Sequence, residues 1–438
     1  MDNVIQTENR MLKFKFKYLY LLLLIFGCVF ASLVGNQTLC LFLCFLFWGS
    51  ILLVDLDKSY CLVFFSYPLS GTYDTVGLTH FFNISLIVLF FKLIIMSVYK
   101  KKLTKNHILC ISFVVLILIY DSTIAMVNNL LTTDYFVNYT IWISVLVVLL
   151  TSIYREKISL KKIYLWFYFG YMVGASLCLF NLNLKYGSIF STPNGYRFLG
   201  MLRDPNYYSV CGILLVFIPF TLKIKYKYVF SITAMVVTVL SISKMSILLL
   251  LIGWILYLII YIFNIKRIPL NFKLSNVIVL TFVSLVTFLF FERGIFDIVY
   301  EKFVFRLDSY SLTTGRDYLQ SYFLHEYFNN IQTFLFGRSL DYNKVYMVEY
   351  SGIAGMVSHN TYIDVLMSFG LIGSILYIYT IVIIFKNYNI KGNVTINKVI
   401  LSILFIISLF ALSYLKADGF MLIVLLLLLE FSEMKEED

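Results

Sequence analysis

The chain has 438 residues, of which 61% are hydrophobic and 13% are charged, and its formal net charge is +11. Its mean hydropathy of +0.87 is higher than the core of a water-soluble protein of this size needs, which excludes an ordinary soluble domain. The basic residues stand in short clusters between apolar runs, so the positive charge indicates membrane topology and no nucleic-acid partner.

Most of the apolar length falls into runs of roughly 17 to 25 residues, which is the span of a bilayer's hydrocarbon core. Lipid offers no partner for backbone polar groups, so these runs are predicted to be helices. We expect an all-α polytopic integral membrane protein with about 12–14 transmembrane helices. The expected helices are 15–35, 38–54, 60–70, 80–99, 107–126, 137–153, 161–181, 207–222, 227–242, 245–264, 274–292, 359–385, 397–414 and 418–432, with 60–70 short enough to be a re-entrant piece.

Two long polar stretches divide the chain into five parts. Residues 1–182 and 207–292 are predicted transmembrane regions, separated by an extracytoplasmic loop over 183–206. A large extracytoplasmic loop follows over 293–358, before the last transmembrane region at 359–438.

Lysine and arginine are distributed unevenly between the two predicted faces of the membrane. With the N-terminus inside, the cytoplasmic side carries 23 of the 35 basic residues and the outer side carries 11, which predicts that both termini are cytoplasmic. Arginine makes up three of the inner 23 but six of the outer 11. A guanidinium grips phosphate oxygens in a bidentate way, so the outer arginines favour phosphate binding, with pairing to loop carboxylates as the alternative.

The first outer loop carries Arg197 and Arg203 directly before a predicted helix. Asp204 or Asn206 suits a helix cap and Pro205 suits a first helical turn, so this helix is expected to point its positive end outward.

In the large outer loop, residues 317–330 are predicted to form an amphipathic helix in the membrane interface. His325 belongs to its polar side. Its apolar side consists of Tyr318, Leu319, Tyr322, Phe323 and Phe328. The tyrosines suit packing or stacking on sugar faces, and packing is the expected role.

Ser358-His359-Asn360, at the mouth of the helix expected over 359–385, is where chemistry is expected. A charged loop with Arg338 precedes it, and Asp364 follows about one and a half turns into the helix, where it is expected to orient a neighbouring helix or pair with an arginine.

Three pieces of this pattern stand in a recognisable order over roughly residues 190–390. They are Arg197-x-x-Gly200-x-x-x-Asp204-Pro205-Asn206; then Thr314-Gly315-Arg316; then Gly337 followed by His359-Asn360-x-Tyr362 and Gly370-Leu371-Ile372-Gly373. In them the chain resembles the superfamily of Wzy-type O-antigen polymerases and O-antigen ligases of bacterial polysaccharide assembly. One departure is Lys244, where members often have arginine, so the charge is kept and the bidentate fork is lost.

The resemblance implies a GT-C-like glycosyltransferase architecture in the cell membrane, with its active site on the extracytoplasmic side. It implies a polysaccharide polymerase, whose product would be the O-antigen of lipopolysaccharide, a capsule or an exopolysaccharide. Donor and acceptor would be oligosaccharides on undecaprenyl diphosphate, and a flippase and a chain-length regulator are implied as partners besides membrane lipids.

The expected reaction is an inverting, metal-independent glycosyl transfer that needs no cofactor. A diphosphate is already a good leaving group, so a base for the attacking hydroxyl is the remaining requirement. His359 is the candidate base, because a helix N-terminus and nearby arginines disfavour imidazolium. The alternative is that it caps its helix or hydrogen-bonds a loop. The residues expected to bind diphosphate or acidic sugar are Arg197, Arg203, Lys244, Arg316, Arg338, Asn206 and Asn360.

Two other functions remain open. A ligase would use the same chemistry with another acceptor for the finished glycan. A lipid-linked oligosaccharide flippase or other transporter would be expected to carry internal repeats and midplane charges, whereas only Lys92, Asp121 and Glu292 are placed to sit deep and no repeat is seen. A purely structural scaffold leaves the outer arginine bias unexplained.

Overall fold

The structure is a computed structural model, and it describes residues 23–32, 34–70, 81–100, 103–132, 135, 140–154, 157–179, 202, 205–241, 243–263, 315–349, 354–387, 396–410 and 412–415. Within these ranges every regular element is a helix and there is no strand. The helices expected over 274–292 and 418–432, and the loop arginines Arg197 and Arg203, lie outside the described residues.

The first half of the described chain holds a helix over Leu23–Ser32 and six labelled helices. They are α2 (Gln37–Leu53), α3 (Leu56–Ser66), α4 (Phe81–Tyr99), α5 (Lys105–Val127), α7 (Thr140–Ser152) and α8 (Leu160–Leu179). The second half holds α9 (Pro205–Thr221), α10 (Lys227–Leu240), α11 (Lys244–Phe263), α14 (Arg316–Asn329), α15 (Ile331–Phe336), α16 (Tyr342–Tyr346), α17 (Thr361–Asn387) and α18 (Ile396–Ser408).

Most helices begin and end within a few residues of their predicted bounds, and the main differences concern α3, α15, α16 and α18. α3 has 11 residues, which at about 1.5 Å per residue covers roughly half of a hydrocarbon core. α18 stops at Ser408, six residues before its expected end, because the chain after it turns to bind the start of α17. α15 and α16 were not predicted.

Three of the described helices are long and apolar enough to cross a membrane, judged by length and composition: Phe81–Tyr99, Lys105–Val127 and Thr361–Ile384. Several shorter apolar helices accompany them, among them α2, α9 and α10. The larger count of about 12–14 spans stays a prediction.

The exposed side chains of these helices are more apolar than many of the buried ones. On α17, Ile375 and Ile378 are exposed while Ser374 and Thr380 are buried. On α5, Asp121 is fully buried. A helix in water places its polar face outward, so this arrangement is what a lipid-facing surface requires.

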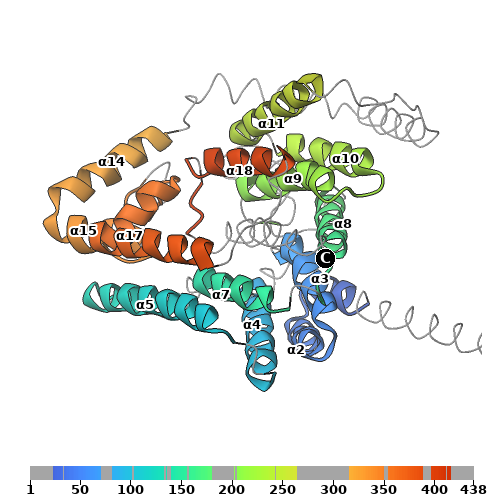
Figure 1. Ribbon diagram of the computed structural model, residues 1–438, viewed down its shortest axis with the longest axis horizontal. Coiled ribbons are helices and arrows are strands. Elements are labelled where there is room, and N and C mark those ends of the chain that lie inside the picture. The colour runs from blue at the N-terminus through green and yellow to red at the C-terminus, as the bar shows by residue number, and fades with distance from the viewer. Residues whose placement is uncertain are drawn as a thin grey trace, which may run out of the picture.

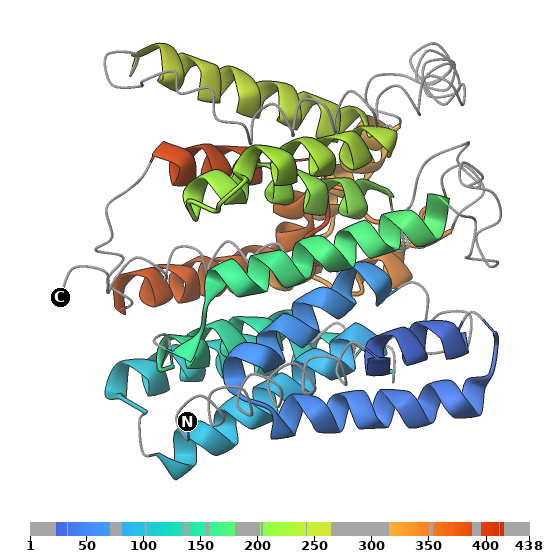
Figure 2. The same ribbon diagram turned by 90° about the vertical axis from the view of Figure 1, so that its right-hand side faces the viewer.

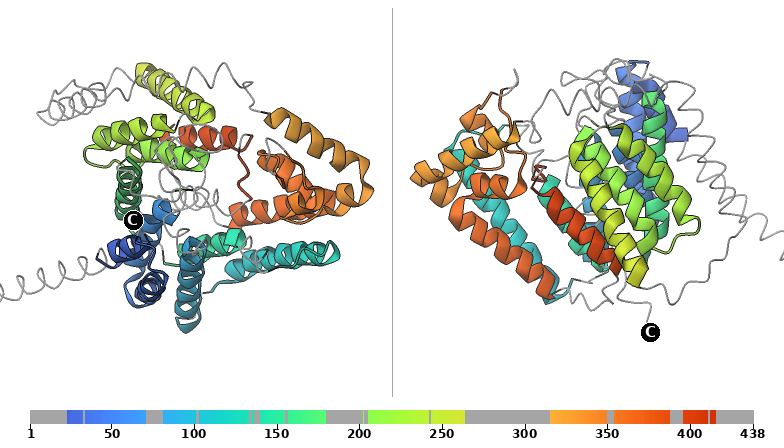
Figure 3. Two further views of the ribbon diagram at one scale, coloured as in Figure 1. Left: turned by 180° about the vertical axis from the view of Figure 1, so that it is seen from behind. Right: turned by 90° about the horizontal axis from the view of Figure 1, so that it is seen from above.

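The described helices pack in three groups, which are joined where α5 packs on α7 and α8 packs on α9 and α10 (Figure 1). α9 packs on α10, α11 and α18, while α3 packs on α8 and α4 on α2 and α7. α17 packs on α5 and is covered by α14 and α15. In Figure 2 the axes of most long helices are roughly aligned with one another, and Figure 3 shows α14 and α15 beside α17 at one side of the molecule.

A close crossing of two glycines bends α17. Gly370 has φ +60° and interrupts the helix. A Cβ on Gly370 would lie 2.4 Å from the backbone nitrogen of Gly337, whose own φ is +78°. The backbone nitrogens of Arg338 and Ser339 donate to the carbonyls of Met367 and Ser368, at 2.8 Å each. The segment after α15 thereby satisfies carbonyls that the bend removes from the helical ladder.

α5 holds the same crossing from its other side. The Tyr120 hydroxyl lies within hydrogen-bond distance of the carbonyls of Phe336 (2.9 Å) and Phe369 (3.0 Å). The buried Asp121 carboxylate accepts from the backbone nitrogen of Leu340 at 3.1 Å and from the Tyr135 hydroxyl. The described part of the loop that was predicted to lie outside, called the outer loop below, therefore forms one hydrogen-bonded unit with two candidate membrane spans.

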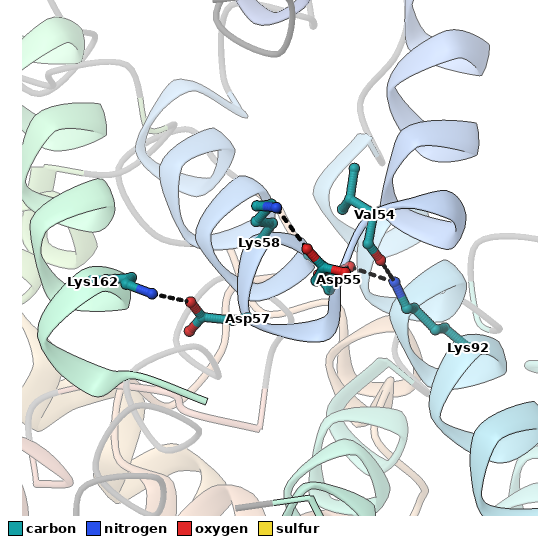
Figure 4. A network of polar contacts seen from close by, with 7 residues as sticks. Val54, Asp55, Asp57, Lys58, Lys92 and Lys162 are labelled. Atoms are coloured by element: carbon teal, nitrogen blue, oxygen red, sulfur yellow. Dashed lines mark hydrogen bonds and ion pairs between the residues drawn. The ribbon is translucent and has the colours of Figure 1, made fainter. Parts of the chain in front are cut away.

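Lys92, which was expected deep in a helix, is buried in α4 and closes the end of α2 (Figure 4). Its ammonium donates to the carbonyls of Ile51 (2.9 Å) and Val54 and to the Ser59 hydroxyl (2.8 Å). Carbonyls at a helix C-terminus carry partial negative charge, so the lysine stabilises this end.

Two ion pairs lie at the start of α3, and the Lys58–Asp55 pair is the one on the side of Lys92 (Figure 4). Lys58 binds Asp55 at 2.6 Å, and Lys162 of α8 binds Asp57 at 2.8 Å. Asp57 also accepts from the backbone nitrogen of Ser159 at 2.7 Å, so it fixes the start of α8 against α3.

Candidate active site

α17 begins with a side-chain cap supplied by Asn360. Its Oδ1 accepts from the backbone nitrogens of Tyr362 (3.0 Å) and Ile363 (3.4 Å). An asparagine at this position satisfies donors that have no partner inside the helix. The amide oxygen is therefore engaged by the helix, and Asn360 as a whole is only 7% exposed. Its expected contact with diphosphate stays a prediction.

His359 stands directly before this cap, with φ +53°. The left-handed region is uncommon for a residue with a Cβ, although histidine is enriched there, and holding it costs on the order of 1 kcal/mol. The side chain is half-buried. Asn360 caps α17, so the alternative in which His359 caps this helix is wrong, and His359 has a strained backbone beside the cap. The role of His359 as a base stays a prediction.

A buried polar cluster, formed by Ser358, Tyr342 and Asp364, surrounds the His359 turn. The Ser358 backbone nitrogen donates to the Tyr342 hydroxyl at 3.0 Å, and that hydroxyl donates to Oδ1 of Asp364. The Ser358 hydroxyl donates to the same Oδ1 at 2.6 Å and accepts from the Asn360 backbone nitrogen at 3.0 Å. Asp364 was expected to orient a neighbouring helix or to pair with an arginine. Through Tyr342 and Ser358 it holds the first residue of α16 and the turn before α17.

Tyr342 comes from α16, in the large outer loop, and is fully buried. Its ring stands edge-on to Phe323 of α14 with the ring centres 5.0 Å apart. Burial, followed by the adjacent Asp364 charge, raises the pKa of the Tyr342 hydroxyl well above its ordinary value. Tyr342 is therefore a neutral hydrogen-bond donor at physiological pH. No spacing in the sequence pointed to this tyrosine.

α14 covers this cluster with a stripe of apolar side chains. Leu319, Phe323 and Tyr327 are buried and pack with Tyr342 and Met367 in one apolar cluster. The stripe repeats every four residues, as a helix face does. Leu319 and Phe323 were expected on the packed side, and the expected Tyr322 is partly buried against the same cluster. Tyr327 was not predicted to pack there.

Of three other predictions for α14, two are wrong and one is confirmed. Tyr318 and Phe328, which were expected on the packed side, are exposed. Both lie one residue outside the stripe, about 100° around the helix. His325 is exposed and lies against the Asn329 amide, as expected of a polar-face residue.

The starts of α9 and α11 lie side by side. The Ser243 hydroxyl donates to Oδ1 of Asn206 at 3.1 Å, and Ser209 and Ser246 share a hydrogen bond one turn further on. Lys244 is the first residue of α11 and is half-buried. The structure therefore brings two predicted binding residues, Asn206 and Lys244, to neighbouring positive helix ends.

The segment 412–415 connects these helix ends to α17. The Thr361 hydroxyl donates to the Leu412 carbonyl at 2.6 Å and accepts from the Tyr414 backbone nitrogen at 3.1 Å. On the other side, the Tyr207 hydroxyl donates to the Ser413 carbonyl at 2.9 Å. One short segment therefore fixes the first turn of α9 relative to the first turn of α17.

The outer arginines that the structure describes have different surroundings. Arg338 donates through Nε to the Thr333 hydroxyl (2.9 Å) and through Nη1 to Oδ1 of Asn128 (2.8 Å). Its guanidinium thus holds the segment after α15 to the end of α5, through a hydroxyl and an amide and not through the loop carboxylates that the alternative named. Arg316 is the first residue of α14, after Gly315 at φ +76°.

Comparisons with known proteins do not identify the chain. No family model matches it, and neither a curated protein nor a solved structure does.

Proposed function

We propose that this chain is a membrane-embedded glycosyltransferase that joins lipid-diphosphate-linked oligosaccharide repeat units into a polysaccharide. The observation that supports this most is the strained His359 turn, held between two anchored residues at the start of α17. Backbone strain persists where the surrounding structure fixes it, and such positions cluster at functional sites.

In the proposed reaction, a sugar hydroxyl of one repeat unit attacks the anomeric carbon of the growing chain. A new carbon–oxygen bond forms as the bond between that carbon and the diphosphate breaks, and the electron pair leaves with the lipid diphosphate. His359 takes the hydroxyl proton. The diphosphate product is already a stable anion, so this step asks for no general acid.

The starts of α9 and α11 are proposed to hold the diphosphate. Backbone N–H groups and the positive end of a helix favour an anion, and Lys244 adds a full charge beside Asn206. Arg197 and Arg203 precede α9 in the sequence and are proposed to act with this group, together with Arg316.

A membrane location fits the apolar exposed faces of α5 and α17. The proposed orientation fits the contacts, because residues expected on one side meet each other. Asn206 meets Ser243, next to Lys244 of the outer group, whereas Lys58 and Lys162 of the inner group bind Asp55 and Asp57 of the same short segment.

The test is polymerisation by the purified chain in nanodiscs, supplied with a lipid-diphosphate-linked repeat unit and read by product size. The wild-type chain and His325→Gln are expected to give a ladder of oligomers. His359→Gln is expected to leave single repeats, because the amide accepts no proton. His325 is the matched control, since it is an exposed histidine with an amide neighbour.

Two outcomes would contradict this function in different ways. Ladders of full length from His359→Gln would remove His359 from the mechanism. Single repeats from folded wild-type protein would contradict a polymerase, and adding a second lipid acceptor would then test for a ligase.

A further inference from the structure

We infer that Tyr342, Ser358 and Asp364 form a positioning network that sets the direction of the His359 side chain. For its effect on the reaction, this inference rests on the proposed function. It assigns a role to three residues from three places in the chain: Tyr342 from α16, Ser358 from the histidine turn and Asp364 from α17.

Both neighbours of His359 are anchored by hydrogen bonds, and the Ser358 hydroxyl takes part in both anchors. Ser358 is held at its backbone nitrogen by Tyr342 and at its hydroxyl by Asp364. Asn360 is held at its backbone nitrogen by the Ser358 hydroxyl and at its side chain by the first turn of α17. A residue between two fixed neighbours has its backbone angles imposed on it, which accounts for the φ of +53° at His359.

The network is buried, whereas the histidine is not. Tyr342, Ser358 and Asp364 are all 3% exposed or less, and His359 is half-buried. The network is therefore out of reach of a glycan, and it acts on the reaction only through the position of His359. A general base must stand within hydrogen-bond reach of the proton that it takes, so small displacements are costly.

The outer loop supplies Tyr342 with a second set of supports. The Asn343 amide donates to the Gly355 carbonyl at 2.5 Å, and the Met356 backbone nitrogen donates to the Val348 carbonyl at 3.1 Å. These bonds hold the α16 region beside the chain that leads into Ser358. A shift of the α16 region would therefore move Ser358 and the histidine turn with it.

The first experiment reads the position of His359 without any reaction. The chain has four histidines, so imidazole signals of isotope-labelled protein in nanodiscs can be assigned by His359→Ala. Tyr342→Phe and Ser358→Ala are expected to move the His359 signals and their titration midpoint. Tyr346→Phe is the matched control, since its hydroxyl binds Thr333 at 2.7 Å, away from the turn.

The second experiment measures chain extension. Ser358→Ala and Tyr342→Phe are expected to lower the turnover rate about a hundred-fold with little change in KM, since misplacing a catalytic group by about 1 Å has effects of that size. Asp364→Asn keeps an acceptor oxygen for both hydroxyls, so it is expected to retain far more activity than Asp364→Ala. Tyr346→Phe is expected to resemble the wild-type chain.

The two experiments separate the two proposals. Unchanged His359 signals in folded Tyr342→Phe and Ser358→Ala would overturn the positioning network, whatever the activity. Shifted signals in a chain that makes no polymer would support the network and contradict the polymerase.

Discussion

Substituting alanine at Gly370 tests the crossing on which the histidine helix depends. The added Cβ would lie 2.4 Å from the Gly337 nitrogen and 2.5 Å from the Phe336 nitrogen. Both neighbours are backbone atoms, so no side chain can swing away. The backbone angle φ of +60° at this position is also unfavourable for any residue with a Cβ.

The expected loss of stability has two parts. At Gly370 the positive φ is combined with a ψ of −168°, a backbone region essentially restricted to glycine, and holding a residue with a Cβ there costs roughly 1–3 kcal/mol. Forcing a methyl group into a packed site costs about 1–3 kcal/mol, which brings the sum to roughly 2–6 kcal/mol. Separating the two backbones would also weaken the bonds from Arg338 and Ser339 to α17, which places Gly370→Ala towards the upper end.

Alanine substitutions at two other glycines measure the backbone strain and the helix propensity without a close contact. Gly355 has φ +72° and no atom closer than 3.8 Å to an added Cβ, so Gly355→Ala should cost only the strain, about 1–2 kcal/mol. Gly49 lies inside α2 with nothing within 4 Å, so Gly49→Ala should stabilise by about 0.5–1 kcal/mol.

The assay is equilibrium unfolding of the three variants in one detergent. The order of stability should be Gly49→Ala, then wild type, Gly355→Ala and Gly370→Ala. If Gly370→Ala were as stable as Gly355→Ala, the close approach of Gly337 and Gly370 would be wrong, and with it the account of why α17 bends.

Three further predictions concern the site. His359→Gly and His359→Ala should both abolish polymerisation, but the glycine variant should be more stable by about 1 kcal/mol because it relieves the left-handed backbone; equal unfolding midpoints would argue against the strain. Burial and the Asp364 charge raise the pKa of Tyr342, so its contribution to stability is complete at neutral pH and is lost as pH rises above about 10. The difference in melting temperature between wild type and Tyr342→Phe should accordingly shrink above that pH, and a constant difference would contradict a buried neutral hydroxyl. Thr361→Val should cost about 1–3 kcal/mol by leaving polar atoms of 412–415 unpaired, whereas Thr123→Val, an exposed hydroxyl bonded within its own helix, should be near neutral in the same unfolding assay.

The sequence by itself determined most helices and their bounds. An apolar run of bilayer length has only one way to satisfy its backbone in lipid, so runs such as 107–126 and 227–242 indicated α5 and α10 within two residues at each end. It also located the start of α17 at Ser358-His359-Asn360, because a polar residue before a long apolar run is the local signature of a helix cap.

Only the tertiary structure decided what surrounds that start. Tyr342 reaches Asp364 from 22 residues away, and Gly337 meets Gly370 across the bend of α17. The engagement of Arg338 with Asn128 spans 210 residues. Such contacts depend on which helices lie side by side, and no local period records them. Spacing along the chain specifies a helix, because its hydrogen bonds are local, whereas a site assembled from a loop and three helix ends is specified only once those helices have packed.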